Sequence, residues 1–84
     1  MFTVDVRKLF GAQIARLRRA KGWSQEKLAL ESGLARSYMG GVECGRRNIS
    51  LVKICRLAST LDIRLAVLMD FPITKDDDSP TLAQ

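Results

Sequence analysis

The sequence predicts an all-α fold, a small bundle of five helices, and three features lead to this prediction. Apolar residues recur at helical spacing along most of the chain. Aspartate or serine residues that can cap a helix precede several of these stretches, and glycines that can end a helix follow two of them. With 84 residues the chain can bury one modest core, and domains of this size are often stabilised by association, which favours a dimer.

The first helix is expected over residues 6–21, with Asp5 as its N-cap and Gly22 at its end. Its apolar side is formed by residues at helical spacing, namely Val6, Leu9, Phe10, Gln13, Ile14 and Leu17. Arg18 lies at the edge of that side, where a buried guanidinium needs a carboxylate partner. Glu43 is the best candidate for this partner, and we expect the two residues to form a structural ion pair.

The second helix is expected to begin at Gln25, because the Ser24 hydroxyl can accept a hydrogen bond from an amide group of the first turn. The helix should stop near Ser32. Gly33, the next residue, can adopt a positive φ just past a helix end at no steric cost. A sharp turn is therefore expected after residue 33.

A short third helix is expected over residues 36–42. Met39 and Val42 lie three residues apart and should share its buried face. On the second helix, Ala29 and Gly33 leave a small patch that the third helix can cross closely. Two helices joined by a short turn in this way form a helix-turn-helix, a geometry that fits DNA binding.

Two further helices are expected after a polar loop. Ser50 can cap a fourth helix over residues 51–61. Residues 63–69 are unusually apolar and predict a short fifth helix, ended by Pro72. This helix can close the core. We favour a dimer seam, because so short an apolar helix cannot bury all its faces within a small domain. The residues assigned to the seam are Ile63, Leu65, Leu68 and Met69.

Charge is unevenly distributed along the chain, whose net charge is +5. Residues 6–56 hold 12 Lys and Arg against 3 Asp and Glu, whereas residues 57–84 hold 2 against 5. The basic part coincides with the helix-turn-helix, as an electrostatic footprint on phosphates would. Residues 73–84 are expected to be a disordered acidic tail, which leaves residues 1–72 as the folded DNA-binding domain.

Other classes of protein find little support in the sequence. An enzyme is not expected, because the chain has no His, no nucleophile paired with a base, and no phosphate-cradling glycine loop. No cofactor is expected, and no metal, since Cys44 and Cys55 show no familiar zinc spacing. Both thiols are expected to be reduced in a cytoplasmic protein, with Cys55 as a small buried filler. No apolar run approaches the ~20 residues of a membrane span.

The motif residues resemble the Cro/C1 (XRE-type) helix-turn-helix family of transcriptional regulators over roughly residues 8–68. The matching positions are Gln25, Ala29, Gly33, Leu34, Met39, Val42, Glu43, Gly45 and the NxSL stretch at residues 48–51. The segments RSYMGGVE and GRRN look most like the controller proteins of restriction-modification systems. The resemblance implies a lambda repressor-like DNA-binding domain and the same pairing of Arg18 with Glu43. Ala35 and Cys44 depart from the family, which often has a capping hydroxyl at the first position and Arg or Asn at the second.

Position within the motif assigns the DNA contacts. The second motif helix enters the major groove with its N-terminal residues on base edges, which assigns base contacts to Arg36, Ser37 and Tyr38. The Tyr38 ring can meet a thymine methyl or a sugar. Arg47 can reach either a base or a phosphate, and we include it with the base contacts. Backbone contacts are assigned to Gln25, Gly40, Gly41, Arg46, Asn48 and Lys53. For the two glycines, close approach by DNA and a packing need leave the same signature in the sequence.

These assignments predict a sequence-specific transcription regulator that binds double-stranded DNA as a homodimer on a palindromic operator. A restriction-modification controller is the specific form that the resemblance suggests. The alternative is a protein-interaction module on the same fold, such as an antitoxin or a coactivator-like adaptor, which would use the fifth helix to hold a different protein. The basic motif surface favours DNA.

Overall fold

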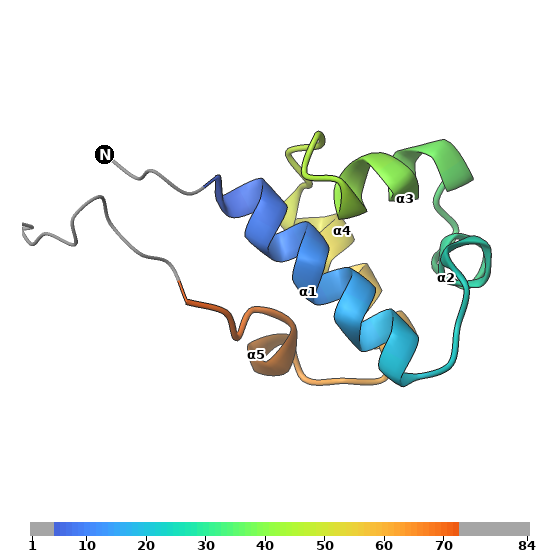
Figure 1. The fold of residues 1–84 in the computed structure, drawn as a ribbon. Coiled ribbons are helices and arrows are strands. Elements are labelled where there is room, and N and C mark those ends of the chain that lie inside the picture. Colours follow the sequence, from blue (N-terminus) through green and yellow to red (C-terminus); the bar gives the residue numbers. More distant parts are fainter. Residues whose placement is uncertain (1–4, 73–84) are drawn as a thin grey trace, which may run out of the picture.

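Five helices follow one another in the expected order in the computed structural model, which describes residues 5–72 (Figure 1). They are α1 (Val6–Ala20), α2 (Gln25–Ser32), α3 (Arg36–Glu43), α4 (Leu51–Leu61) and α5 (Leu65–Leu68). Residues 5–72 contain no strand, and the predicted all-α fold is confirmed. The predicted acidic tail, residues 73–84, lies outside the described residues, so the domain boundary stays a prediction.

Local side chains set most of the helix ends. Asp5, Ser24 and Ser50 each accept a hydrogen bond from a backbone N–H in the first turn of their helix, at 3.0, 3.0 and 3.3 Å. Gly33 ends α2 with a φ of 72°, in the left-handed region. Ala35 makes no side-chain cap, so the departure from the family leaves the start of α3 without this stabilisation.

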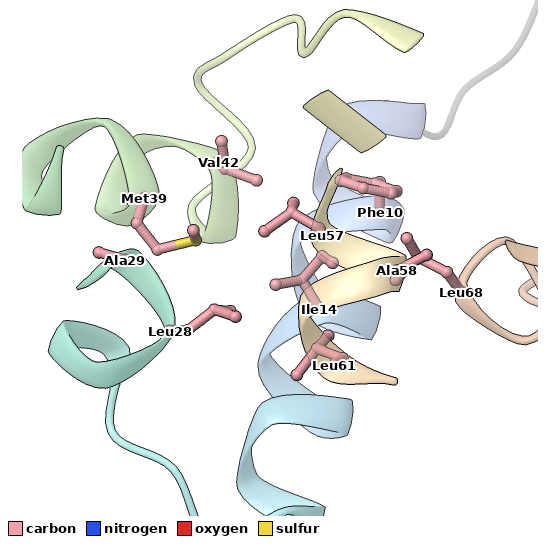
Figure 2. Packing of buried hydrophobic residues seen from close by; sticks show 10 residues of the cluster. All are labelled: Phe10, Ile14, Leu28, Ala29, Met39, Val42, Leu57, Ala58, Leu61 and Leu68. Carbon is pink, nitrogen blue, oxygen red and sulfur yellow. The ribbon is translucent and has the colours of Figure 1, made fainter. Parts of the chain in front are cut away.

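One cluster of buried side chains joins all five helices (Figure 2). Its members are Phe10, Ile14, Leu28, Ala29, Met39, Val42, Leu57, Ala58, Leu61 and Leu68. As predicted, Met39 and Val42 turn the inner face of α3 into this cluster. The first residues of α3 lie outside it, at the edge of the molecule, which leaves them accessible to a partner (Figure 1).

α1 and α3 approach closely at Gly11, a residue that we did not single out from the sequence. A Cβ at this position would meet the carbonyl oxygens of Val42 and Glu43, the second of them at 2.6 Å. These are backbone atoms, which cannot move aside as a flexible side chain could. The absence of a side chain at Gly11 therefore lets the C-terminal end of α3 rest directly on α1.

α5 is shorter than predicted, since it spans Leu65–Leu68 and not residues 63–69. Asp62 has a φ of 57°, and the backbone at Arg64 is extended, so a new helix cannot begin before residue 65. At the other end, the buried Gln13 side chain donates from Nε2 to the carbonyl oxygens of Val67 and Asp70, at 2.9 and 3.3 Å. Contacts with α1, and not Pro72 alone, therefore fix the end of α5.

Two side chains lie where the sequence prediction did not place them. Leu68 was assigned to a dimer seam, but it is 0% exposed and packs in the core of the protomer, so it can contribute no area to a seam. Cys55 was expected to be a buried filler, but it is exposed. Because Leu57, Ala58 and Leu61 turn one side of α4 to the core, Cys55 faces outward. None of the helices in the described range has the length and apolar character that crossing a membrane requires.

Candidate nucleic-acid interface

A nearly buried ion pair joins α1 to the end of α3. Arg18 donates from Nε and Nη2 to the two carboxylate oxygens of Glu43, at 2.8 and 3.0 Å. Its Nη1 also donates to the carbonyl oxygen of Trp23, at 2.9 Å. The two charged side chains are only 11% and 7% exposed. The hydrogen bond to Glu43 raises the pKa of Arg18 above its ordinary value. The predicted pair is therefore present.

Gln25 belongs to the same network. Its Nε2 donates to Oε1 of Glu43 at 3.0 Å, so the first residue of α2 is held beside the last residue of α3. A side-chain amide carries two N–H donors, and the second remains available for a phosphate oxygen. The contact between Gln25 and DNA stays a prediction, in which Glu43 sets the orientation of the amide.

The first turn of α3 presents polar side chains to solvent. Arg36 and Ser37 are exposed, whereas Tyr38 is half-buried against the core. The Tyr38 ring faces two cations of its own chain: the Arg47 guanidinium carbon lies 5.2 Å from the ring centroid and Lys53 Nζ lies 4.4 Å from it. The sequence suggested that this ring meets a thymine methyl or a sugar. In the structure, the side chains of Arg47 and Lys53 already lie beside it.

Gly40 and Gly41 differ in their surroundings. Gly41 is buried, and a Cβ there would lie 2.9 Å from Cγ of Arg47. The Arg47 side chain covers this position, so Gly41 presents no open surface in this structure, and its assignment to DNA backbone contact stays a prediction. A Cβ on Gly40 would have only Gln25 Oε1 near it, at 3.5 Å. For Gly40, close approach by DNA stays a prediction.

The basic loop after α3 is fixed at its start. Gly45 has a φ of 79°, and a Cβ on it would lie 2.8 Å from Cα of Lys8, so the loop turns directly against the first turn of α1. Arg46, Arg47 and Asn48 follow and are exposed. The contacts of Tyr38 with Arg47 and Lys53 bring residues from α3, this loop and α4 together.

Sequence reasoning missed Gly11 altogether, and it did not foresee the contacts that Gly45 and Trp23 make. Gly11 supports α3 from below, Gly45 holds the loop, and Trp23 attracts Lys21 and Lys27, whose Nζ atoms lie 5.2 and 4.9 Å from its ring centroid. A glycine inside a helix that is otherwise apolar on one side was the available signal for Gly11. Within the described residues, no cluster of Cys, Asp and Glu could hold a metal ion.

The helix pair α2 and α3, with its exposed first turn and the adjoining basic loop, defines a helix-turn-helix DNA-binding protein. Comparison with known proteins gives the family. Residues 14–68 match the helix-turn-helix family HTH_3. The chain is 38% identical over 77 residues to the uncharacterized HTH-type transcriptional regulator y4dJ of Sinorhizobium fredii, covering 92% of this chain and 95% of that relative.

Two further relatives share a named role. Control protein C.BamHI of Bacillus amyloliquefaciens is 40% identical over 70 residues, covering 82% of this chain and 86% of the relative. The solved structure of the restriction-modification controller protein C.AhdI from Aeromonas hydrophila matches with a TM-score of 0.74 and 54% identity, covering 77% of this chain and 98% of that one. The chain therefore belongs to the Cro/C1-type helix-turn-helix family of transcriptional regulators. Because this family consists of DNA-binding regulators and not enzymes, the expectation of a non-enzymatic protein is confirmed.

Proposed function

We propose that this regulator binds a palindromic operator as a homodimer in the cytoplasm and controls genes of a restriction-modification system. The observation that carries the proposal is the exposed first turn of α3, with Arg36 and Ser37, on a helix whose other end is anchored by the Arg18–Glu43 pair. A rigid helix with an accessible N-terminal turn is what base recognition in the major groove requires. The relatives named as controller proteins support the regulated process.

The residues assigned to DNA divide into two groups of contacts. Arg36, Ser37 and Arg47 contact base edges, since a guanidinium can donate two hydrogen bonds to guanine and a hydroxyl can pair with several bases. Tyr38 contributes its hydroxyl. The backbone contacts are Gln25, Gly40, Arg46, Asn48 and Lys53, which fix the register of the protein on the duplex.

A homodimer follows from the two-fold symmetry of a palindrome, because each protomer reads one half-site. The seam includes Ile63, Leu65 and Met69; Leu65 and Met69 are exposed and Ile63 is half-buried in the protomer. Leu51 and Val52 of α4, which are 69% and 71% exposed, add apolar surface that association would cover.

The decisive experiment selects bound sites from a random pool of duplex DNA. We expect a palindrome whose half-sites lie about one helical turn apart, bound by two protomers in sedimentation analysis. The dependence of affinity on salt should be steep, because each neutralised phosphate contributes about −0.9 to the log-log slope. Failure to enrich any sequence, or an affinity that hardly changes with salt, would contradict the proposal.

The exposed apolar residues also favour a second candidate, a module that holds a different protein. Leu30 of α2 is 77% exposed and lies on a helix that carries no assigned base contact. A stable complex with a different protein that survives nuclease treatment, together with no selected DNA site, would favour this adaptor function. A selected palindrome with a two-protomer complex would favour the regulator.

A further inference from the structure

We propose that Gly41 is a positioning residue for DNA recognition. Because it has no side chain, Arg47 can lie along α3 and bring its guanidinium to the end of that helix that faces the bases. The inference rests on the proposed function, since it assumes that the first turn of α3 contacts base edges. It changes the role of Gly41 from a contact with DNA to a contact with the arginine that reaches DNA.

The stem of Arg47 occupies the space that a side chain at residue 41 would need. A Cβ built on Gly41 would lie 2.9 Å from Cγ, 3.3 Å from Nε and 3.6 Å from Cδ of Arg47. The first distance is too short for carbon atoms that are not bonded. One of the two groups must therefore give way, and Arg47 moves more easily because it is an exposed, flexible side chain on a loop.

The head of Arg47 is held at a second point. Its guanidinium carbon lies 5.2 Å from the centroid of the Tyr38 ring, within the range of a cation–π interaction. Tyr38 is the third residue of α3 and belongs to the same turn as Arg36 and Ser37. The guanidinium of a loop residue is thereby placed beside the helix turn that reaches base edges.

Tyr38 is a stable support for this arrangement. Its ring is half-buried and packs against the core cluster, a contact that does not depend on Arg47. The ring therefore keeps its position when Arg47 leaves it to meet DNA. An arginine that is already ordered near its target loses less conformational freedom on binding than one that extends from a mobile loop. The place of Arg47 beside the turn assigned to base edges favours a contact with guanine, to which a guanidinium can donate two hydrogen bonds.

A double-mutant cycle tests the inference. The proteins are the wild type, Gly41→Ala, Arg47→Ala and the double variant, each measured on the selected operator and on operators substituted one base pair at a time. We expect Gly41→Ala to weaken operator binding about tenfold and to relax preference at the same base pairs as Arg47→Ala. In the Arg47→Ala background, Gly41→Ala should have almost no further effect. The melting temperature of Gly41→Ala should not fall, since alanine favours a helix more than glycine does.

Gly40→Ala is the matched control. It makes the same change one residue earlier in α3, but its Cβ would meet only Gln25 Oε1, at 3.5 Å. Its effect on operator affinity should therefore be the same with and without Arg47. If the wild type selects an operator but Gly41→Ala and Arg47→Ala weaken operator affinity additively, this inference alone would be overturned. A wild-type protein that selects no operator would overturn the proposed function as well.

A second pair of variants tests the contact between Arg47 and the Tyr38 ring without changing residue 41. Tyr38→Phe keeps the aromatic ring, whereas Tyr38→Leu removes it. Arg47→Ala should cost the same factor in affinity in the Tyr38→Phe protein as in the wild type, and a smaller factor in the Tyr38→Leu protein. Equal factors in all three backgrounds would show that the ring does not position Arg47, and would overturn the inference.

Discussion

The Arg18 guanidinium on α1 and the Glu43 carboxylate at the end of α3 form two hydrogen bonds, 2.8 and 3.0 Å long, across 25 residues of sequence. Gly11 lies about two helical turns earlier on α1, where the carbonyl end of α3 rests on it. α1 therefore holds the C-terminal end of α3 at two points, one polar and one steric. The opposite end of α3, which carries Arg36 and Ser37, projects from the fold.

We expect Glu43→Ala to lower the melting temperature sharply, because it leaves a nearly buried guanidinium without its partner, at a cost of roughly 3 to 5 kcal/mol. Replacing both residues, as Arg18→Met with Glu43→Leu, should recover much of that stability. Recovery should be incomplete, since the Trp23 carbonyl also loses its donor. Thermal unfolding of the four proteins of the cycle measures the coupling.

Glu43→Gln is the control for this cycle, because it keeps the shape of the side chain and an acceptor for Gln25 but removes the charge. The melting temperature of Glu43→Gln should fall between that of the wild type and that of Glu43→Ala. Strictly additive melting effects of the single Arg18 and Glu43 variants would show that the two groups do not stabilise one another.

Local chemistry explains why most helix ends could be predicted. Asp5, Ser24 and Ser50 accept hydrogen bonds from N–H groups only two or three residues away, so the sequence near each residue is sufficient. The bounds of α5 could not be obtained in this way. Its C-terminal end depends on Gln13, which lies 54 residues from the carbonyl group of Val67 that it binds.

In the candidate site, too, some contacts could be predicted from residue types and others could not. A guanidinium at the edge of an apolar face needs a carboxylate, and this rule led from Arg18 to Glu43. No comparable rule connects Gly41 with Arg47. Their contact depends on how the loop after α3 folds back over the helix, which is set by the turn at Gly45 against Lys8. Distances between elements, and not residue types, decide such contacts.

Arg36→Ala and Lys53→Ala should separate base recognition from backbone contact. We expect Arg36→Ala to cost about 1 to 3 kcal/mol on the selected operator and much less on scrambled duplexes, because a base contact exists only on the right sequence. Lys53→Ala should weaken all duplexes by a similar factor and make the salt dependence shallower. Titrations of both variants on both kinds of DNA measure the contrast. An equal loss on the two kinds of DNA for Arg36→Ala would assign Arg36 to the backbone.

The start of α1 should respond to acid through Asp5. Arg7 donates from Nη2 to Asp5 Oδ2 at 2.9 Å, and this side-chain contact is the main reason that the pKa of Asp5 lies below its ordinary value of 3.8. A carboxylate whose pKa falls on folding stabilises the native state above its unfolded pKa, and this contribution is lost as the pH drops through the folded value.

The comparison of the wild type with Asp5→Asn isolates this effect, because asparagine keeps the N-cap but not the ion pair. Near neutral pH the wild type should melt slightly higher, and the difference should vanish once the carboxyl group is protonated. The difference should be small, since both groups are exposed. Carboxyl NMR titration of the wild type checks the direction, and a pKa for Asp5 at or above the ordinary value would contradict it.

Two glycine-to-alanine changes should have opposite effects on stability, although each places a methyl group inside a helix. Alanine is favoured over glycine there by about 1 kcal/mol. At Gly40 this gain should be realised, since the added Cβ would meet nothing closer than Gln25 Oε1, at 3.5 Å. At Gly11 the Cβ would meet backbone carbonyl oxygens at the end of α3, and α1 and α3 would have to separate. Overpacking of this kind typically costs about 1 to 3 kcal/mol and outweighs the gain. Urea unfolding of the two variants should therefore move the midpoint up for Gly40→Ala and down for Gly11→Ala.

The operator affinity of folded Gly11→Ala should also fall, because separating α1 from α3 moves the helix that reads the bases. Variants that are equally destabilised by a change far from α3 should keep their operator affinity. Similar midpoints for the two variants would mean that α1 and α3 do not touch at Gly11.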